Sequence, residues 1–128
     1  MAVAIVRLDS PRKPREGLRI GTVRRPPRGV PKEEYAARDL YDVWLFNLSP
    51  SEQLLKESRP IADETGWRTC RRRFLAEMKA PHARRDLDLL AALSHQTNFA
   101  VGCYCEDESH CHRALLRTLL GERNAELA

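Results

Sequence analysis

The chain has 128 residues, of which 42% are hydrophobic and 31% are charged, and its formal net charge at pH 7 is +4. A chain of this size builds one core but not two, and its composition is that of a globular protein rather than a disordered or fibrous one. No apolar run approaches the ~20 residues that a membrane-spanning helix needs, so we predict a single domain over residues 1–128 without a membrane partner.

The positive charge is concentrated at one end of the chain. Residues 1–32 contain nine Lys or Arg residues and two acids, whereas the remaining residues contain thirteen and sixteen. Such a basic segment favours an anionic partner, either a small molecule such as phosphate or a nucleotide, or a nucleic acid. The alternative is a solvated basic surface without a ligand, and composition does not decide between the two.

Three of the four cysteines lie within residues 103–111, beside histidines. This crowding is typical of reduced thiols or metal ligands in a cytosolic protein rather than of a disulfide framework. The apolar run at residues 1–7 is too short for a secretion signal and lacks the charged lead-in. We therefore predict a cytoplasmic protein with no structural disulfide and no cofactor, and the sequence leaves its oligomeric state open.

The N-terminal part of the chain predicts two strands and a stiff basic loop. Apolar residues predict a strand near 3–7, and a weak alternation predicts a second strand near 18–23. The segment that follows contains three prolines, which exclude a helix interior and a central strand. A loop of this rigidity can present Arg24 and Arg28 to an anion at little entropic cost. The aromatic segment at 41–48 fits a strand or a buried loop equally well.

The middle of the chain predicts three helices. Ser49 as N-cap, proline at the first helical position and Glu52 at the third form a capping box for a short helix over 53–57. A longer helix is expected over 63–79, with an apolar stripe on one face and a run of arginines on the solvated face. Pro81 opens the third of these helices.

The last third of the chain contains the candidate chemistry. An apolar run predicts a strand near 98–104 in the interior of the sheet, and a helix follows an acidic turn with Ser109 as its N-cap. His110 to Arg113 would then fill the first helical turn, where unpaired N–H groups and the helix dipole favour an anion or a thiolate. This helix is expected to end at Gly121, with residues 121–128 fraying.

Several blocks of the sequence resemble the YeaO-like branch of the bacterial domain-of-unknown-function family numbered 488. They are the basic loop at Arg24 and Pro27–Gly29, the segment from Trp44 to Ser51, the helix around Phe74–Glu77, and the signature Cys103-Tyr104 with His110–Arg113. The resemblance extends from about Ile5 to Leu120. It implies a small α/β fold and no established activity.

The chain departs from that family pattern at three positions. Val23 stands where relatives usually carry an acid, Pro26 replaces a tryptophan, and Cys105 replaces a glutamate after the tyrosine. If the two acids that relatives carry at the positions of Val23 and Cys105 serve as a base or as metal ligands, this chain has lost that role. The elements and the resemblance together predict an α/β fold, a single small domain whose short, mostly parallel sheet is flanked by about four helices.

The leading functional hypothesis is an anion-binding domain. Arg24, Arg28 and Arg113 would bind the oxyanions of a phosphate, a nucleotide or a nucleic acid, and His110 would lie beside them at the start of the last helix. This hypothesis uses both the charge asymmetry and the predicted helix terminus. A dedicated nucleic-acid-binding module has less support, because the chain lacks interleaved aromatic residues and any helix-turn-helix or zinc-finger signature.

The alternatives centre on the cysteines. A reactive-thiol enzyme or redox sensor would use Cys111 as nucleophile and His112 as its catalytic partner, because a thiol in a first helical turn beside histidines loses its proton readily. Cys103 or Cys105 would then be the resolving thiol. A metal site would combine these three cysteines with one histidine, but the usual paired zinc-ligand spacing is missing, so we predict no metal. The same residues can also be purely structural.

Overall fold

The fold is a four-stranded, entirely parallel sheet with helices packed against it. The computed structural model describes residues 1–26, 29–35, 37–58, 63–104 and 111–128. The spatial order of the strands is β1-β4-β2-β3. The strands are β1 (Val3–Arg7), β2 (Leu18–Gly21), β3 (Val43–Trp44) and β4 (Phe99–Cys103). The predicted α/β class with a short parallel sheet is therefore confirmed, as is the interior position of the last strand.

β4 lies in the interior of the sheet, between β1 and β2. All five of its residues are buried, which is typical of parallel strands covered from two sides. It pairs in parallel with β1, from Val3 opposite Phe99 to Arg7 opposite Cys103, and with β2 from Leu18 opposite Phe99. Parallel pairing brings the carboxyl ends of these three strands to the same edge of the sheet.

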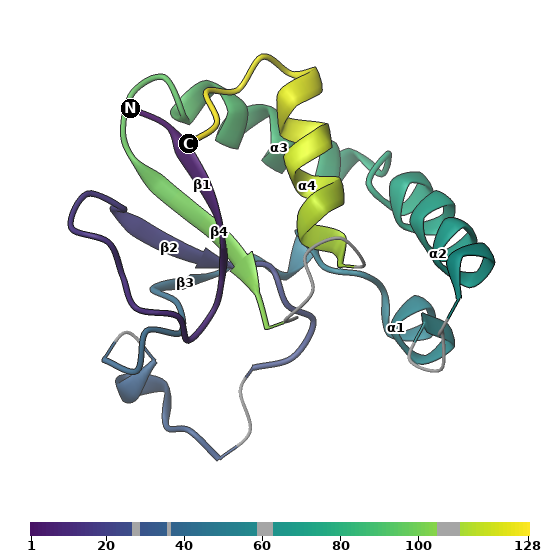
Figure 1. Ribbon diagram of the computed structural model, residues 1–128, viewed down its shortest axis with the longest axis horizontal. Coiled ribbons are helices and arrows are strands. Elements are labelled where there is room, and N and C mark those ends of the chain that lie inside the picture. Colours follow the sequence, from purple (N-terminus) through teal and green to yellow (C-terminus); the bar gives the residue numbers. More distant parts are fainter. Residues whose placement is uncertain (27–28, 36, 59–62, 105–110) are drawn as a thin grey trace.

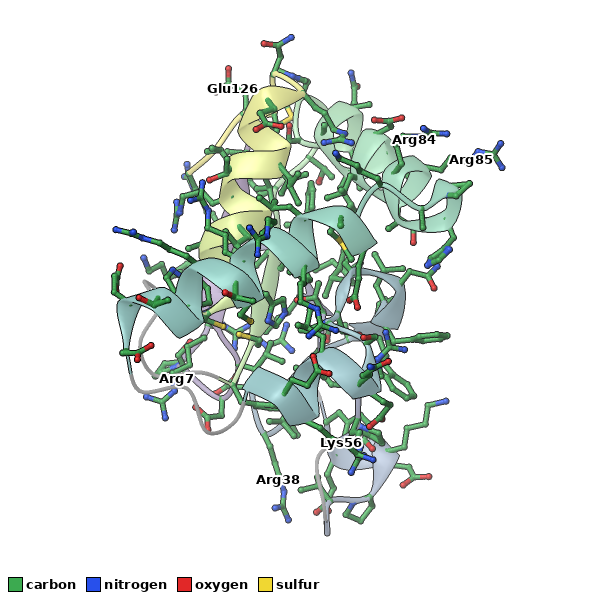
Figure 2. The ribbon with its side chains drawn as sticks, turned by 90° about the vertical axis from the view of Figure 1, so that its right-hand side faces the viewer. Arg7, Arg38, Lys56, Arg84, Arg85 and Glu126 are labelled. Carbon is green, nitrogen blue, oxygen red and sulfur yellow. The ribbon has the colours of Figure 1, made fainter. Side chains whose placement is uncertain are left out.

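In the described part of the chain, four α-helices lie on the same side of the sheet (Figure 1). They are α1 (Glu52–Ser58), α2 (Glu64–Glu77), α3 (Pro81–Leu93) and α4 (His112–Glu122), and two short 3₁₀ helices, η1 (Lys32–Glu34) and η2 (Phe46–Leu48), flank β3 in the sequence. Asp63 caps α2 by accepting from the backbone N–H of Gly66, and Pro81 is the first residue of α3. Arg84 and Arg85 project outward from α3 (Figure 2).

The predicted capping box of α1 is wrong in its register. The helix begins at Glu52, and the side chain of Ser51, not Ser49, accepts from the N–H of Leu54 over 3.1 Å. The reciprocal carboxylate comes from Glu77 at the end of α2, which accepts from both the backbone N–H and the hydroxyl of Ser51. A capping partner supplied by another helix leaves no local sequence signal, so the local pattern indicates the wrong serine.

Contrary to the prediction, the end of the chain is not frayed. After α4, which continues one residue beyond Gly121, the segment lies beside β1. The N–H of Val3 donates to the carbonyl of Glu126, and the N–H of Ala128 donates to the carbonyl of Val3. Leu127 forms a parallel bridge with Val3 and packs against the core. Backbone pairing therefore replaces the solvation expected of a free end.

The buried side chains form two clusters. The larger lies between the sheet and the helices, and includes Phe74, Leu87, Phe99 and Leu116. The smaller lies at the carboxyl edge of the sheet; it contains Leu8, Val23, Leu40, Tyr41, Cys103 and Cys111. Two of the candidate cysteines thus belong to this second cluster. Among the described residues, no helix has the length and apolar character needed to cross a bilayer.

A candidate cysteine–histidine site at the carboxyl edge of the sheet

The candidate site forms at the carboxyl ends of β1, β4 and β2, which are neighbours in the sheet. Just beyond β1, the N–H of Leu8 donates to the carbonyl of Cys103, and beyond β2 the N–H of Thr22 donates to the carbonyl of Gly102 over 2.9 Å. Both bonds continue the ladder of a parallel sheet past its last paired residues. Gly102 admits this close packing, because a Cβ there would lie 2.4 Å from the carbonyl oxygen of Val6.

Two cysteines meet at this edge. Cys103 is the last residue of β4 and Cys111 is the N-cap of α4, and their sulfur atoms lie 2.8 Å apart. The two residues are only 1% and 2% exposed. Cys70 lies apart from them on α2, half-buried against the main core. All three of these cysteines are reduced thiols in the structure.

The last helix begins later than predicted. Its first residue is His112, and Cys111 occupies the N-cap with an extended backbone and without a side-chain capping bond. Ser109, predicted as the N-cap, lies outside the described residues, and so does His110. Cys111 therefore stands at the positive end of the helix dipole, where a thiolate is favoured.

His112 is oriented by the end of β2. Its Nε2 lies 2.9 Å from the carbonyl oxygen of Thr22 and 3.3 Å from the hydroxyl of the same residue. Because a carbonyl oxygen only accepts, Nε2 carries the hydrogen and Nδ1 carries the lone pair. Nδ1 in turn lies 3.7 Å from the sulfur of Cys111. The ring also packs against Phe74 of α2, with their centroids 5.6 Å apart.

The hydroxyl of Thr22 completes this arrangement. It donates to the carbonyl of Gly102 over 3.0 Å, and Thr22 itself is fully buried. Its oxygen is then an acceptor for the Nε2 hydrogen of His112, so the imidazole, the end of β2 and the end of β4 form one hydrogen-bonded unit. The candidate donor atoms of Cys103, Cys111 and His112 all lie within 4.8 Å of one another.

Arg24 is held by the protein itself. Its Nε donates to the carbonyl of Pro50 over 2.9 Å, its Nη2 to the carbonyl of Ser49, and its guanidinium lies over the ring of Phe46. These contacts tie the loop after β2 to the segment before α1. Arg28, the second arginine of the predicted anion site, lies outside the described residues.

Arg113 is buried at the start of α4. The residue is 5% exposed and occupies the second position of the helix, directly after His112. A cation at a helix N-terminus is opposed by the dipole, and a buried cation needs negative charge close by. Because Arg113 directly follows His112, it lies at the end of α4 that adjoins the two thiols.

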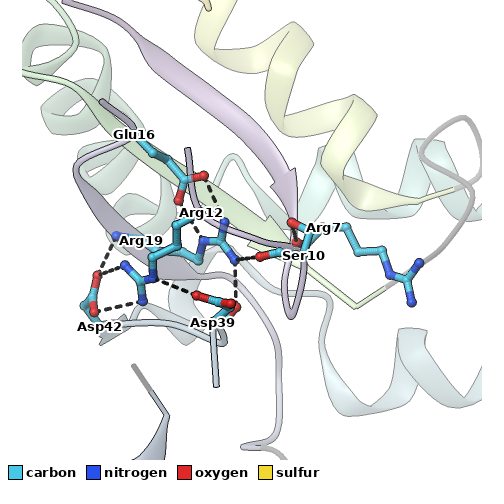
Figure 3. Close-up of polar contacts among 7 residues, drawn as sticks. All are labelled: Arg7, Ser10, Arg12, Glu16, Arg19, Asp39 and Asp42. Atoms are coloured by element: carbon cyan, nitrogen blue, oxygen red, sulfur yellow. Dashed lines mark hydrogen bonds and ion pairs between the residues drawn. The ribbon is translucent and has the colours of Figure 1, made fainter. Parts of the chain in front are cut away.

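Part of the basic N-terminal charge is paired with carboxylates within the chain. Arg19 is completely buried; its guanidinium makes two hydrogen bonds to the carboxylate of Glu16 and two to the backbone carbonyls of Ser10 and Asp39 (Figure 3). Arg12 pairs through two hydrogen bonds with Asp42, and Arg25 with Glu52. These three arginines, of the nine basic residues in 1–32, are thus paired with carboxylates of the chain, so part of the charge asymmetry is structural and is weaker evidence for an anionic partner.

Two tyrosines lie in the same apolar cluster as the thiols. Among the described residues, the hydroxyls of Tyr41 and Tyr104 are buried without a hydrogen-bond partner. Burial raises the pKa of Tyr41 to about 12 and raises that of Tyr104 still further. Both phenols therefore stay neutral at physiological pH, in the apolar cluster that contains Cys103 and Cys111.

Sequence reasoning identifies Cys103, Cys111 and His112 but not the residues that position them. Thr22 and Phe74 come from distant segments, and nothing local marks them as neighbours of the cysteines. One signal points to Thr22. It lies near the end of the strand predicted over 18–23, and in a mostly parallel sheet that end belongs at the same edge as the end of the strand predicted over 98–104.

Comparison with known proteins identifies the family. A family model described as the active DUF488-N3 subclade, DUF488-N3a, matches residues 3–124. The chain belongs to the DUF488-N3a family. This confirms the wider family that the sequence blocks resemble, while the narrower YeaO-like branch stays a prediction. No curated relative and no solved structure matches the chain.

Proposed function

We propose that this DUF488-N3a protein is a reactive-thiol protein whose Cys103 and Cys111 form a reversible disulfide in the cytoplasm. The observation that carries the proposal is the 2.8 Å separation of the two sulfur atoms in a buried cluster. The family description as an active subclade also supports chemistry rather than a purely structural role.

Cys111 is the proposed nucleophile and Cys103 the resolving thiol. Cys111 has the Nδ1 lone pair of His112 at 3.7 Å and lies at a helix N-terminus, and both features favour a nucleophilic sulfur. The sulfur of Cys103 is close enough to attack Cys111 once that residue is oxidised. His112 accepts the thiol proton as Cys111 reacts, and Thr22 keeps the ring in the tautomer that permits this.

Burial of both sulfurs favours a small oxidant of the hydroperoxide class. In the first step the Cys111 sulfur attacks one peroxide oxygen, the O–O bond breaks, and a sulfenic acid and one molecule of water or alcohol form. In the second step the Cys103 sulfur attacks the sulfenic sulfur, the S–O bond breaks, and the disulfide and a second water form. Two electrons pass from the dithiol to the peroxide, and a cellular thiol restores the dithiol by exchange.

Peptide mapping after peroxide treatment tests the proposal. The reduced chain should lose two hydrogen atoms in mass on treatment with hydrogen peroxide. After alkylation of the remaining thiols, its peptide map should show a link between Cys103 and Cys111. In Cys103→Ser the sulfenic acid on Cys111 should persist and react with dimedone, whereas Cys70→Ser, the matched control, should behave as the wild type. A wild-type map without the Cys103–Cys111 link would rule the proposal out.

A second candidate function is the binding of an anion, either a small molecule or a nucleic acid, at the start of α4. The observation that favours it is the buried cation of Arg113 beside the N-terminus of that helix. Arg24, Arg28 and His110 complete this proposed site. Thermal-shift assays with phosphate, nucleotides and short oligonucleotides at low salt test this function. A bound anion should raise the Tm of the wild type, and it should raise the Tm of Arg113→Lys by a smaller amount. If none of these three kinds of anion raises the Tm of the wild type, the anion-binding function is ruled out.

A further inference from the structure

We propose that the reduced side chains of Cys103 and Cys111, together with His112, bind one divalent cation of the zinc class. Their candidate donor atoms lie within 4.8 Å of one another, on the end of β4 and the start of α4. Two thiolates and an imidazole are the donors that zinc and its softer neighbours prefer over magnesium or calcium. The cluster therefore has the composition of a transition-metal site.

The orientation of His112 is the second observation that supports a metal site. Metal-bound histidines commonly donate their other ring N–H to a backbone carbonyl, which sets the tautomer and aims the unprotonated nitrogen at the metal. His112 makes this contact: Nε2 donates to the carbonyl of Thr22 over 2.9 Å, and Nδ1 faces the sulfur of Cys111. Thr22 and Phe74 thus hold the ring with Nδ1 on the side of Cys111.

The spacing of the donors fits one ion after a small adjustment. Two sulfurs each ~2.3 Å from a tetrahedral zinc are about 3.8 Å apart, so the sulfurs of Cys103 and Cys111 must separate from 2.8 Å. Three protein ligands leave one position for an exchangeable ligand, as in catalytic zinc sites. The metal set expected from the sequence contains Cys105 and His110 in addition to Cys103 and Cys111, and Cys105 and His110 both lie outside the described residues.

Metal binding and the proposed redox chemistry exclude one another at any moment. The metal takes the two sulfurs as reduced thiolates, and formation of the disulfide consumes both. A bound ion should therefore slow the reaction with peroxide, and oxidation should release the ion. The metal site itself does not depend on the redox function, because it requires only that both thiols be reduced.

Cobalt substitution tests the site directly. The full chain, reduced and stripped of metal with a chelator, is titrated with Co²⁺ in the absence of air. We expect one Co²⁺ per chain, sulfur-to-cobalt charge-transfer absorption, the visible bands of tetrahedral Co²⁺, and displacement by one equivalent of Zn²⁺. His112→Ala should bind Co²⁺ more weakly by more than the 10–100-fold typical of outer-shell changes, whereas Cys70→Ser and His82→Ala should match the wild type.

A measurement on the wild type alone guards against a variant that fails to fold. Zn²⁺ should protect Cys103 and Cys111 from iodoacetamide and leave the labelling of Cys70 unchanged. Absence of the cobalt bands, or equal labelling of the pair with and without Zn²⁺, overturns the metal site. The metal-free peroxide assay separates the two proposals: a disulfide without cobalt binding refutes only the metal site, and cobalt binding without a disulfide refutes only the redox centre.

Discussion

The imidazole of His112 donates its Nε2 hydrogen to the carbonyl oxygen of Thr22, ninety positions away in the sequence, over 2.9 Å. This contact joins the first residue of α4 to the end of β2, and it determines which ring nitrogen faces Cys111. The chemistry of the cysteine–histidine site therefore depends on a residue that takes no part in bond breaking.

Thr22→Val tests the positioning role of the Thr22 hydroxyl. The variant keeps the backbone carbonyl that accepts from His112 but removes the hydroxyl that donates to Gly102. Loss of this buried hydrogen bond should lower the free energy of unfolding by about 1 kcal/mol, since the Gly102 carbonyl keeps its second donor, the N–H of residue 22. Urea unfolding measures this. Thr97→Val, at an exposed position, is the control and should change little.

Arg19→Met should strongly destabilise the fold. The substitution leaves the carboxylate of Glu16 buried without its cation, and removing one partner of a buried ion pair costs roughly 3–5 kcal/mol. Removing both charges, in Arg19→Met with Glu16→Leu, should recover much of that loss. Urea unfolding of the two variants checks the prediction, and a double variant no more stable than Arg19→Met would contradict it.

Asp42 should contribute stability that is lost in acid. The hydrogen bonds from Arg12, and then that from the N–H of Arg19, lower the pKa of Asp42 below its ordinary value of 3.8. Ionised Asp42 contributes its full stabilisation at pH values above its ordinary pKa, which it has in the unfolded chain. This contribution disappears as the pH falls through the lower pKa of the folded state. Asp42→Asn should therefore be less stable than the wild type at pH 7, by about 1 kcal/mol given partial exposure, and the difference should shrink below pH 4. A difference independent of pH would argue against this account.

Tyr41→Phe should stabilise the protein. The hydroxyl of Tyr41 is buried without a partner among the described residues, and the raised pKa of this tyrosine means that the folded state resists its ionisation. Removing an unsatisfied buried hydroxyl should gain about 1 kcal/mol. The gain should grow as the pH rises above 10, where the unfolded wild type ionises and the phenylalanine variant does not. Thermal unfolding at pH 7 and pH 10.5 measures both effects, with Tyr35→Phe as control.

Arg24→Ala separates a structural arginine from a ligand-binding one. Loss of the bonds to the carbonyls of Ser49 and Pro50 should cost about 1 kcal/mol in the free energy of unfolding. If Arg24 serves only to make these contacts, phosphate will change the Tm of the variant and the Tm of the wild type by the same amount. Arg25→Ala, whose exposed side chain pairs with Glu52, is the neighbouring control and should change stability little.

Local patterns in the sequence were sufficient to predict the class of the fold and the place of its central strand. The apolar run at Phe99–Cys103 predicts a strand buried on both faces, and only an interior position in a sheet offers that environment. The helices at 64–77 and 81–93 are predictable because Asp63 at the start of the first, Pro81 at the start of the second and the apolar stripe of each are local signals. The crowding of Cys103, Cys111 and His112 in the sequence is likewise enough to mark the candidate site.

What those residues can do depends on contacts that form only when the chain is folded. Arg19, which contributes to the basic charge of the N-terminal segment, is buried in an ion pair with Glu16. Arg24 donates a hydrogen bond to the carbonyl of Pro50, before α1. Ser51, which caps α1, is hydrogen-bonded to a carboxylate on α2, and the end of the chain is hydrogen-bonded to the backbone of β1. Glu16 is only three residues from Arg19, but the other contacts join segments far apart in sequence. Such pairings arise from the order of the strands, which a local pattern of residues does not encode.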